Sequence, residues 1–276
     1  MKISCLQLCS GGDPDRNYAR VKNLLHEAET ARPDVLVLPE YTNFRGRIED
    51  FPSRAASRNG RWFELFSTFA RERKIEVVAG LLIKLSADKA INAVCHFDKE
   101  GRQVHEYQKM HLFDVEHSRS VSSQESRHLA RGSSPVWGTV AGIRAGFAIC
   151  YDLRFPELFR YLTLQGAKVI FLPAAFTAVT GAAHWEVLLR ARAIENQVFI
   201  AAAGQVGPYL EDKASYGRSL IADPWGELLA VAGGPEGGEE VITATLDFAR
   251  QREIREKIPC LDNIRGTCDF PSTNPG

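Results

Sequence analysis

Three isolated reactive side chains follow short apolar segments of the sequence. Glu40 comes after Leu-Val-Leu-Pro, Lys109 after Tyr-Gln and Cys150 after Phe-Ala-Ile. In open α/β sheets, ligands gather at the carboxyl ends of strands, so each side chain is well placed to meet a substrate. Taken singly, a thiol here is most often part of the core, and a Glu or Lys is most often the solvated end of a strand. The three residue types together make a working set for nucleophilic catalysis.

A thiol, a carboxylate and an ammonium group can act together on a carbonyl carbon, as nucleophile, general base and oxyanion donor. A free thiol has a pKa of about 8.5, so little of it is thiolate at neutral pH. We expect Glu40 to lie in a dry pocket that raises its pKa, where it accepts the thiol proton as general base. Lys109 would favour the thiolate and donate to the oxyanion that forms on attack, with the backbone N–H of Tyr151 as the second donor. No histidine is needed for this chemistry.

The elements that would position these residues alternate between strand and helix in the first half of the chain. Apolar residues at helical spacing predict helices over residues 15–32, closed by Pro33, and over residues 60–74. Apolar runs predict strands over residues 3–9, 34–38, 75–83, 93–98 and 104–109. Residues 113–135 are polar with little periodicity, which predicts a long loop of the kind that is often functional.

The second half of the chain continues this mixture. Two strand segments around Gly142 lie within residues 139–149, and a helix begins at Pro156 and ends at Gln165. A further helix is predicted over residues 184–196, with strands over residues 169–174, 198–203, 219–222 and 241–246. The alternation has no internal repeat and no linker, so it predicts a single mixed α/β domain with helices outside the sheets. The pattern alone does not choose between one sheet and two.

Composition restricts the possible partners. The chain has 276 residues, and its 34 Lys and Arg equal its 34 Asp and Glu, so no overall field would attract nucleic acid or an anionic membrane. The N-terminal segment is too short and polar for a signal peptide, and no apolar run reaches the length of a membrane span. The six cysteines have no metal-site spacing, which predicts no metal, no cofactor and thiols kept reduced in the cytoplasm; they are Cys5, Cys9, Cys95, Cys150, Cys260 and Cys268.

Three segments of the chain, in order, resemble the motifs of one enzyme family. Residues 148–158 around Cys150 resemble the nucleophile motif of the nitrilase (carbon–nitrogen hydrolase) superfamily. Residues 37–40 are similar to its glutamate motif and residues 107–114 to its lysine motif. The resemblance extends from Ile3 to about Phe248. A single motif of this kind would be weak, but three in the family's order are specific.

The resemblance implies a fold and a set of roles. The fold would be an α-β-β-α sandwich, a single domain over residues 1–276 with a core over about 1–248. Residues 249–276 would form a C-terminal extension at the interface of a homodimer or larger homo-oligomer, and the helix over 156–165 is a possible contact surface. Glu40 would be the general base, Cys150 the nucleophile and Lys109 the stabiliser of tetrahedral intermediates. Glu125 matches a second glutamate that orients the lysine or assists proton transfer, although it could be a surface carboxylate.

Further segments resemble an amidase branch of the superfamily that acts on deaminated glutathione; they are residues 173–181, 184–196, 214–219 and 223–226. The omega-amidase branch is also similar. Arg154 would meet a substrate carboxylate, because its planar fork binds carboxylates bidentately, or else pair with Glu157 or Asp152. Phe176 and Thr180 would line the pocket, or pack within the fold. Residues 207–213 and 257–276 depart from the branch.

These observations predict an enzyme that hydrolyses a linear amide carrying a free carboxylate, through a thioester on Cys150. The substrate would resemble deaminated glutathione. An omega-amidase acting on α-keto acid amides and a true nitrilase are the alternatives among enzymes. A catalytically idle, dimeric interaction module is the alternative outside them.

Overall fold

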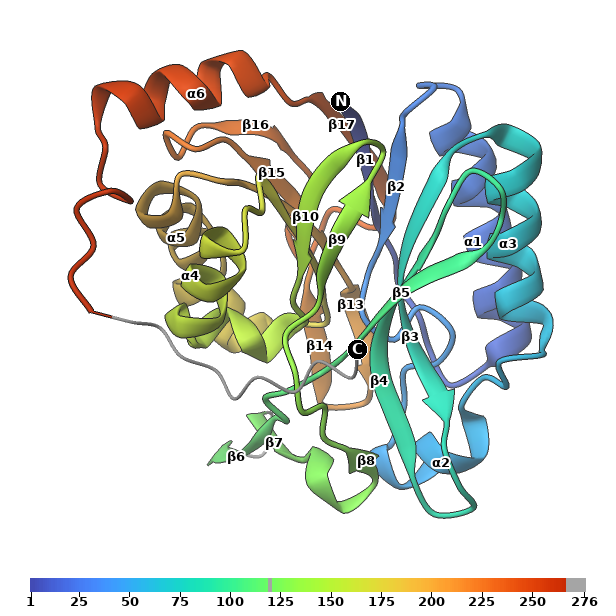
Figure 1. Cartoon of the computed structure of the whole chain (residues 1–276). Coiled ribbons are helices and arrows are strands. Elements are labelled where there is room, and N and C mark those ends of the chain that lie inside the picture. The colour runs from blue at the N-terminus through green and yellow to red at the C-terminus, as the bar shows by residue number, and fades with distance from the viewer. Residues whose placement is uncertain (119–120, 267–276) are drawn as a thin grey trace.

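The fold consists of two β-sheets that face each other, with helices on the outer face of each (Figure 1). The structure is a computed structural model that describes residues 1–118 and 121–266. The layers run helix, sheet, sheet, helix, so the predicted α-β-β-α sandwich is confirmed. The sequence pattern left the number of sheets open, and the described strands form two large ones.

The first sheet has seven described strands in the order β17-β1-β2-β3-β4-β5, with β8 beside β4. β1, β2 and β3 are parallel to one another, β17 is antiparallel to β1, and β4 is antiparallel to β3 and β5 but parallel to β8. The strands are β1 Lys2–Gln7, β2 Val35–Leu38, β3 Glu76–Lys84, β4 Ala90–Phe97, β5 Gln103–Gln108, β8 Leu129–Ala130 and β17 Glu240–Thr245. Helices α1 (Pro14–Glu29) and α3 (Arg61–Arg73) cover its outer face (Figure 1).

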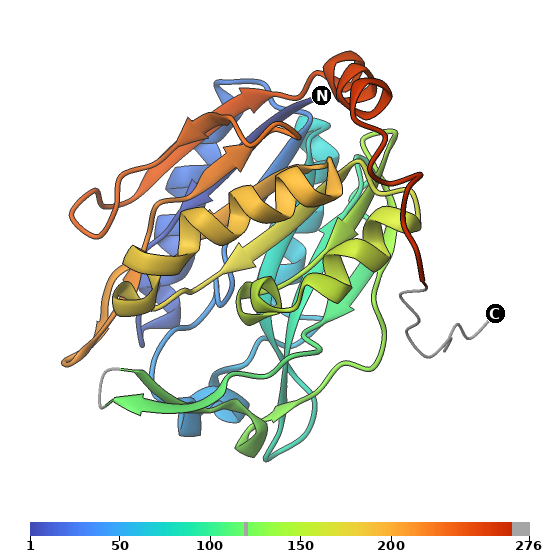
Figure 2. The same ribbon diagram turned by 90° about the vertical axis from the view of Figure 1, so that its left-hand side faces the viewer.

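The second sheet has six described strands in the order β16-β15-β12-β11-β10-β9, of which β10, β11 and β12 are parallel. The strands are β9 Trp137–Val140, β10 Ile143–Phe147, β11 Val169–Ala174, β12 Phe199–Gly204, β15 Leu220–Ala222 and β16 Leu228–Val231. Helices α4 (Pro156–Leu164) and α5 (Ala178–Asn196) lie side by side over its outer face (Figure 2). Two further pairs of strands stand apart, β6 (Asp114–Ser118) with β7 (Val121–Gln124), and β13 (Val206–Leu210) with β14 (Lys213–Tyr216).

Burial on both faces explains the continuous apolar run of β2. Successive side chains of a strand point to opposite faces. Val35 and Val37 therefore join the core between the two sheets, while Leu36 and Leu38 join the core beneath α1 and α3. Both cores are closed to solvent. The carboxyl end of β2 is held firmly between them, and Glu40 follows it.

Several elements differ from the sequence-based expectations. Residues 113–135 are not a plain loop, because they contain the β6–β7 hairpin, the 3-10 helix η2 (Glu125–Arg127) and β8. Helix α5 begins six residues before the predicted start at 184, since Thr177 caps it by accepting a hydrogen bond from the backbone N–H of Thr180. The sequence pattern also missed β13, β14, β16, the short helices η1 (Ile48–Asp50) and α2 (Phe51–Arg54), and α6 (Phe248–Lys257).

The predicted contact surface on α4 is wrong in one respect. The apolar residues Leu158, Phe159 and Leu162 are buried against the second sheet, so they are not available to a partner. The C-terminal extension is described only as far as residue 266, where α6 and the turn after it end. Residues 267–276, which include Cys268, lie outside the described residues.

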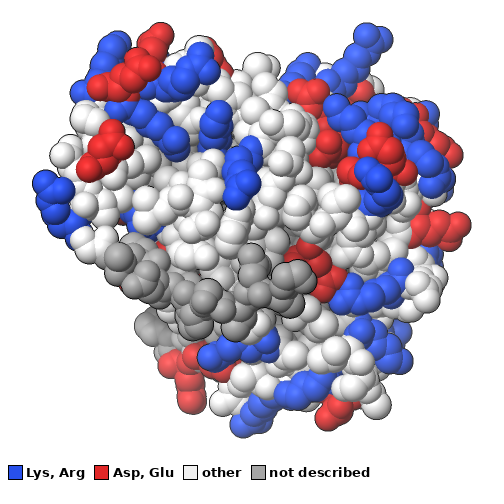
Figure 3. Space-filling model, viewed as in Figure 1, with Lys and Arg blue, Asp and Glu red and all other residues white. Residues whose placement is uncertain are grey.

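The surface carries charges of both signs. On the face seen in Figure 1, basic and acidic side chains are interspersed and do not gather into one basic area (Figure 3). Within the part of the chain that the structure describes, none of the helices is both long and apolar enough to cross a membrane.

Candidate active site

The predicted site residues meet in one pocket of about 360 Å³. Glu40 follows β2, Lys109 follows β5, and Cys150 follows β10 at the start of the 3-10 helix η3 (Cys150–Arg154). Glu125 reaches the same place from η2. The lining includes all eight predicted residues, which are Glu40, Lys109, Glu125, Cys150, Tyr151, Arg154, Phe176 and Thr180.

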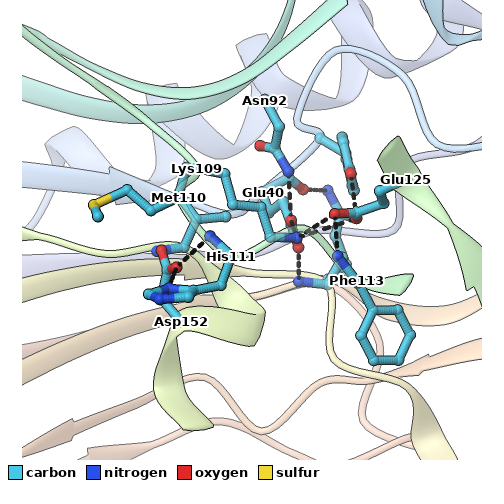
Figure 4. A network of polar contacts seen from close by, with 12 residues as sticks. Glu40, Asn92, Lys109, Met110, His111, Phe113, Glu125 and Asp152 are labelled. Carbon is cyan, nitrogen blue, oxygen red and sulfur yellow. Dashed lines mark hydrogen bonds and ion pairs between the residues drawn. The ribbon is translucent and has the colours of Figure 1, made fainter. Parts of the chain in front are cut away.

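Lys109 lies between two carboxylates at the centre of the site (Figure 4). Its Nζ donates to Oε1 of Glu40 at 2.9 Å and to both carboxylate oxygens of Glu125, at 2.9 and 3.1 Å. Burial alone would lower the pKa of Lys109, but the charges of Glu125 and Glu40 outweigh it and the pKa is raised. The lysine is therefore a fixed cation at neutral pH, and its ammonium can share a hydrogen with an incoming oxyanion.

Glu40 is held on both carboxylate oxygens. Oε1 also accepts a hydrogen bond from Asn92 Nδ2 at 2.7 Å, and Oε2 accepts one from the backbone N–H of Ala175 at 2.8 Å. Burial alone would raise its pKa, but the charges of Lys109 and Arg45 prevail and the pKa lies below its usual value. The expectation of a raised pKa is therefore wrong for the free site, because two cations stand close to the carboxylate.

Glu125 is buried, so the alternative of a surface carboxylate does not hold. Besides Lys109 it accepts hydrogen bonds from the hydroxyl of Tyr41 at 2.7 Å and from the backbone N–H of Phe113 at 2.8 Å (Figure 4). Tyr41 and Phe113 follow Glu40 and Lys109 in the chain by one and four residues. Glu125 thereby holds the loops that carry the other two side chains in one arrangement.

Cys150 stands at a sharp turn between β10 and η3. Its φ of 46° lies in the left-handed region, which a non-glycine residue adopts only at a cost that the surrounding fold must supply. Burial raises the pKa of the thiol, and the charge of Glu40 raises it further. The resting group is thus a protonated thiol beside a carboxylate. Tyr151 follows within the first turn of η3, where backbone N–H groups have no partner inside the helix.

Asp152 fixes the nucleophile turn against the lysine loop, and sequence reasoning did not find this role. Its carboxylate accepts hydrogen bonds from the hydroxyl of Tyr107 at 2.8 Å and from the backbone N–H of Ile149 at 2.8 Å. His111 donates to the other oxygen from its backbone N–H at 3.2 Å, and its Nδ1 lies 2.7 Å from that oxygen (Figure 4). The sequence shows only that an Asp stands two residues after the cysteine. Its burial, which reveals the role, is seen in the structure alone.

The three predicted substrate-binding residues lie on one wall of the pocket. The guanidinium of Arg154 lies over the ring of Phe176, 5.1 Å from its centre, and donates to Nδ1 of His184 at 3.3 Å. It forms no ion pair with Glu157 or Asp152, so that alternative fails. Thr180 lies in the first turn of α5, with its hydroxyl 2.7 Å from that of Thr177. Nothing among residues 1–118 and 121–266 forms a cluster of three His, Cys, Asp or Glu that could hold a metal ion.

Comparison with known proteins adds the family context. Residues 2–256 match the family model described as carbon–nitrogen hydrolase. The chain is 34% identical to human omega-amidase NIT2 over 261 residues, covering 94% of this chain and 92% of that protein. It is also 34% identical to the deaminated glutathione amidase of Synechocystis over 265 residues, covering 94% of this chain and 96% of that one. The crystal structure of the C. elegans NitFhit protein superposes with a TM-score of 0.91 at 32% identity, covering 100% of this chain and 68% of that chain.

Proposed function

This chain belongs to the carbon–nitrogen hydrolase family, and from that premise we propose that it hydrolyses a linear amide with a free carboxylate through a thioester on Cys150. It is an enzyme that acts on the C–N bonds of amides, as its omega-amidase and deaminated glutathione amidase relatives do. The proposal concerns the residues that carry the reaction and the kind of amide.

The first half-reaction forms the thioester. The carboxylate of Glu40 takes the proton of the Cys150 thiol while the sulfur bonds to the carbonyl carbon of the amide. The resulting oxyanion receives hydrogen bonds from Lys109 and from the backbone N–H of Tyr151. Glu40 then gives its proton to the amide nitrogen, the C–N bond breaks, and the amine leaves.

The second half-reaction regenerates the thiol. Glu40 removes a proton from a water molecule, whose oxygen bonds to the thioester carbon. The C–S bond breaks as the tetrahedral intermediate collapses, and the proton returns from Glu40 to the sulfur. The products are a carboxylic acid and the free enzyme.

The observation that carries the proposal is the position of Lys109 between two buried carboxylates next to a protonated thiol. Proton transfer from the thiol to Glu40 removes one of the two negative charges that hold the ammonium. Lys109 is then free to turn toward the oxyanion that forms at the same moment. The low pKa of Glu40 and the high pKa of Cys150 in the free site are compatible with this coupling, because neither group has to change charge before the substrate is attacked.

The alternative function, a catalytically idle interaction module, has less support than the amidase. Burying two carboxylates and an ammonium costs free energy that an apolar core would not. A protein that only bound partners would gain nothing from such a cluster in the wall of an open pocket. A true nitrilase would use the same residues, so substrates must separate it from an amidase.

The substrate resembles deaminated glutathione in this proposal, with α-keto acid omega-amides second. Arg154 supplies a cation for the carboxylate, and no carboxylate of the chain pairs with it in the described residues. Residues 207–213, which depart from the amidase branch, form most of the β13–β14 hairpin and contribute Tyr209, Leu210 and Lys213 to the pocket. Substrate choice commonly sits in such segments.

The test is a panel of carboxylated amides, neutral amides and nitriles, with amine or ammonia release as the readout. We expect turnover of carboxylated amides by the wild type and none by Cys150→Ala. Turnover of nitriles in preference to amides would overturn the amidase assignment. Release that persists in Cys150→Ala would overturn the thioester.

We also propose that the protein is a homodimer in the cytoplasm. Helix α5 exposes Val179, Val187 and Ile194, of which Val187 is 67% exposed, and the neighbouring Trp225 is 54% exposed. Burial of these side chains by a second copy would remove apolar surface from water. Light scattering should give twice the mass of 30.7 kDa, and Val187→Asp should shift it toward the monomer. The described cysteines are all free thiols, as a reducing compartment requires.

A further inference from the structure

A second guanidinium, that of Arg45, lines the same pocket. Arg45 lies in the loop after Glu40 and is only 9% exposed. Its guanidinium lies 3.9 Å from the centre of the Tyr209 ring and 5.2 Å from that of Tyr41. The ring of Tyr209 lies against the guanidinium, whose hydrogen-bond donors lie in its plane and remain for other partners.

These donors are mostly unused. In the described part of the chain, the guanidinium makes one hydrogen bond, a long one of 3.4 Å from Nη2 to the carbonyl oxygen of Ala175. Its Nε is buried without any partner. No carboxylate forms an ion pair with it there. Glu40 lies near enough for the two charges to interact, but it does not contact the guanidinium, so the hydrogen-bond donors of this buried cation remain mostly unsatisfied.

Different elements hold Arg45 and Arg154 in the pocket. The strand order is β12-β11-β10, so β11 lies between the other two. Arg154 ends η3, which follows β10, and lies over Phe176. Arg45 stacks on Tyr209 of β13, which follows β12, and contacts Ala175. Each guanidinium therefore has its own support, and each can bind a carboxylate of its own.

We propose that Arg45 is a second anion-binding residue of the pocket, and that the preferred substrate is a linear amide with two carboxylates, one for Arg45 and one for Arg154. This inference rests on the proposed function, since it specifies the kind of amide that the site takes. An arginine binds a carboxylate with two parallel hydrogen bonds. The Nη1 and Nη2 end of Arg45 suits that geometry, because in the described chain Nη1 makes no hydrogen bond and Nη2 makes only the long one to Ala175. The alternative role for Arg45 is to hold down the pKa of Glu40 through its charge, without touching the substrate.

The experiment uses four amides of equal length with the same scissile bond. One has carboxylates on both the acyl and the amine part, one on the acyl part only, one on the amine part only, and one has none. We compare kcat/KM for the wild type, Arg45→Gln and Arg154→Gln. Arg54→Gln is the control, because Arg54 is an exposed arginine at the end of α2 that does not line the pocket.

We expect each variant to lower kcat/KM for the amide that carries a different one of the two carboxylates. Arg45→Gln should lower kcat/KM about 10- to 150-fold for one singly carboxylated amide, and Arg154→Gln should do so for the other. The doubly carboxylated amide should be sensitive to both, and Arg45→Lys should recover part of the loss because it keeps the charge. Arg54→Gln should change these ratios by less than about threefold, the effect of a distant charge.

Three results would overturn the inference. Losses in both variants on the same singly carboxylated amide would mean one shared carboxylate. An equal loss of kcat/KM for all four amides in Arg45→Gln would assign Arg45 to the support of Glu40. If the wild type gains nothing from the second carboxylate but still hydrolyses singly carboxylated amides, the proposed function stands without the inference. Turnover of none of the four would count against the proposed function itself. Melting curves of each variant exclude loss of the fold.

Discussion

The ammonium of Lys109 lies 2.9 Å from Oε1 of Glu40, and both side chains are about 1% exposed. A pair so completely removed from water depends on its partners remaining in place. Coulombic attraction is stronger there than at the surface, and the cost of an unpaired charge is correspondingly higher. The base of the proposed reaction and its oxyanion donor are therefore one structural unit.

Replacing Lys109 with Met should destabilise the protein as well as inactivate it. The change leaves Glu40 and Glu125 buried without a cation, and loss of one member of a buried pair costs about 3–5 kcal/mol. We expect kcat to fall about 10²- to 10³-fold or more with the loss of an oxyanion donor. Lys84→Met at the exposed end of β3 is the control. Adding Glu125→Gln should restore part of the melting temperature and none of the activity; a full recovery of activity would contradict the role given to Lys109.

The pH profile of kcat/KM should be flat between about pH 5 and pH 8.5. The reacting form needs Glu40 charged and Cys150 protonated. Because the pKa of Glu40 is lowered, its acid limb lies below the usual value of about 4.3, and because the pKa of Cys150 is raised, its alkaline limb lies above about 8.5. Circular dichroism at each pH confirms that the protein is folded. Activity that rises through pH 8.5 would indicate a thiolate in the free enzyme and contradict this arrangement.

Glu40 and Cys150 of the candidate site could be predicted from the sequence because each follows a strand with a plain apolar run. Lys109 follows β5, which is largely polar, so the family resemblance was the stronger signal for it, and the resemblance also supplied Glu125. Arg45 and Asp152 were not predicted as functional. Arg45 becomes prominent only because the fold stacks it on Tyr209, which lies far away in the chain. Contacts of that kind leave no periodicity in the sequence.

Most of the elements that the sequence pattern missed have no plain apolar run. β13 and β14 are partly exposed and form a pair of their own, so they lack the apolar runs that identify β2 or β11. β16 is the exception, since it carries the short apolar run Leu-Leu-Ala-Val. Helix α6 is largely polar and attaches to the body through side chains such as Gln251, whose amide donates to the backbone carbonyls of Lys168 and Gln197. Binary patterning cannot find a helix that is held by hydrogen bonds instead of an apolar stripe.

Covalent trapping should place the acyl group on Cys150. Intact mass spectrometry and peptide mapping after mixing with a slowly hydrolysed carboxylated amide should find the adduct there. Cys5 and Cys95 are buried, and burial raises the pKa of both thiols, so they should not react. Cys150→Ala should abolish turnover at a cost of about 1 kcal/mol or less in stability. Cys260 is exposed and provides the control, since Cys260→Ser should keep full turnover. An adduct on Cys95 or Cys260 would overturn the assignment.

A pair of histidines between the sheets should make stability fall in acid. The rings of His96 and His105 are stacked with Nδ1 atoms 2.9 Å apart, and His96 Nε2 lies 2.8 Å from Glu76. Burial, and then the nearness of His96, lower the pKa of His105. Below about pH 6.5 the unfolded chain therefore binds a proton that the folded protein resists, and stability declines as the pH falls toward the lowered pKa. The melting temperature of the wild type should drop more between pH 7 and 5 than that of His105→Gln; parallel curves would contradict the coupling.

Arg154 should govern the response of the enzyme to substrate charge. A charge-assisted hydrogen bond contributes about 1.5–3 kcal/mol, so Arg154→Ala should lower kcat/KM about 10- to 150-fold for a carboxylated amide and hardly at all for a neutral one of the same size. Arg154→Lys should recover part of the loss, because an ammonium lacks the bidentate geometry. The competing view is that Arg154 mainly supports the pocket wall through its contacts with Phe176 and His184. That view predicts equal losses on both substrates together with a lower melting temperature. Measuring both substrates and the melting curve on one variant decides between them, and equal losses would remove Arg154 from substrate recognition while leaving the roles of Glu40, Lys109 and Cys150 unchanged.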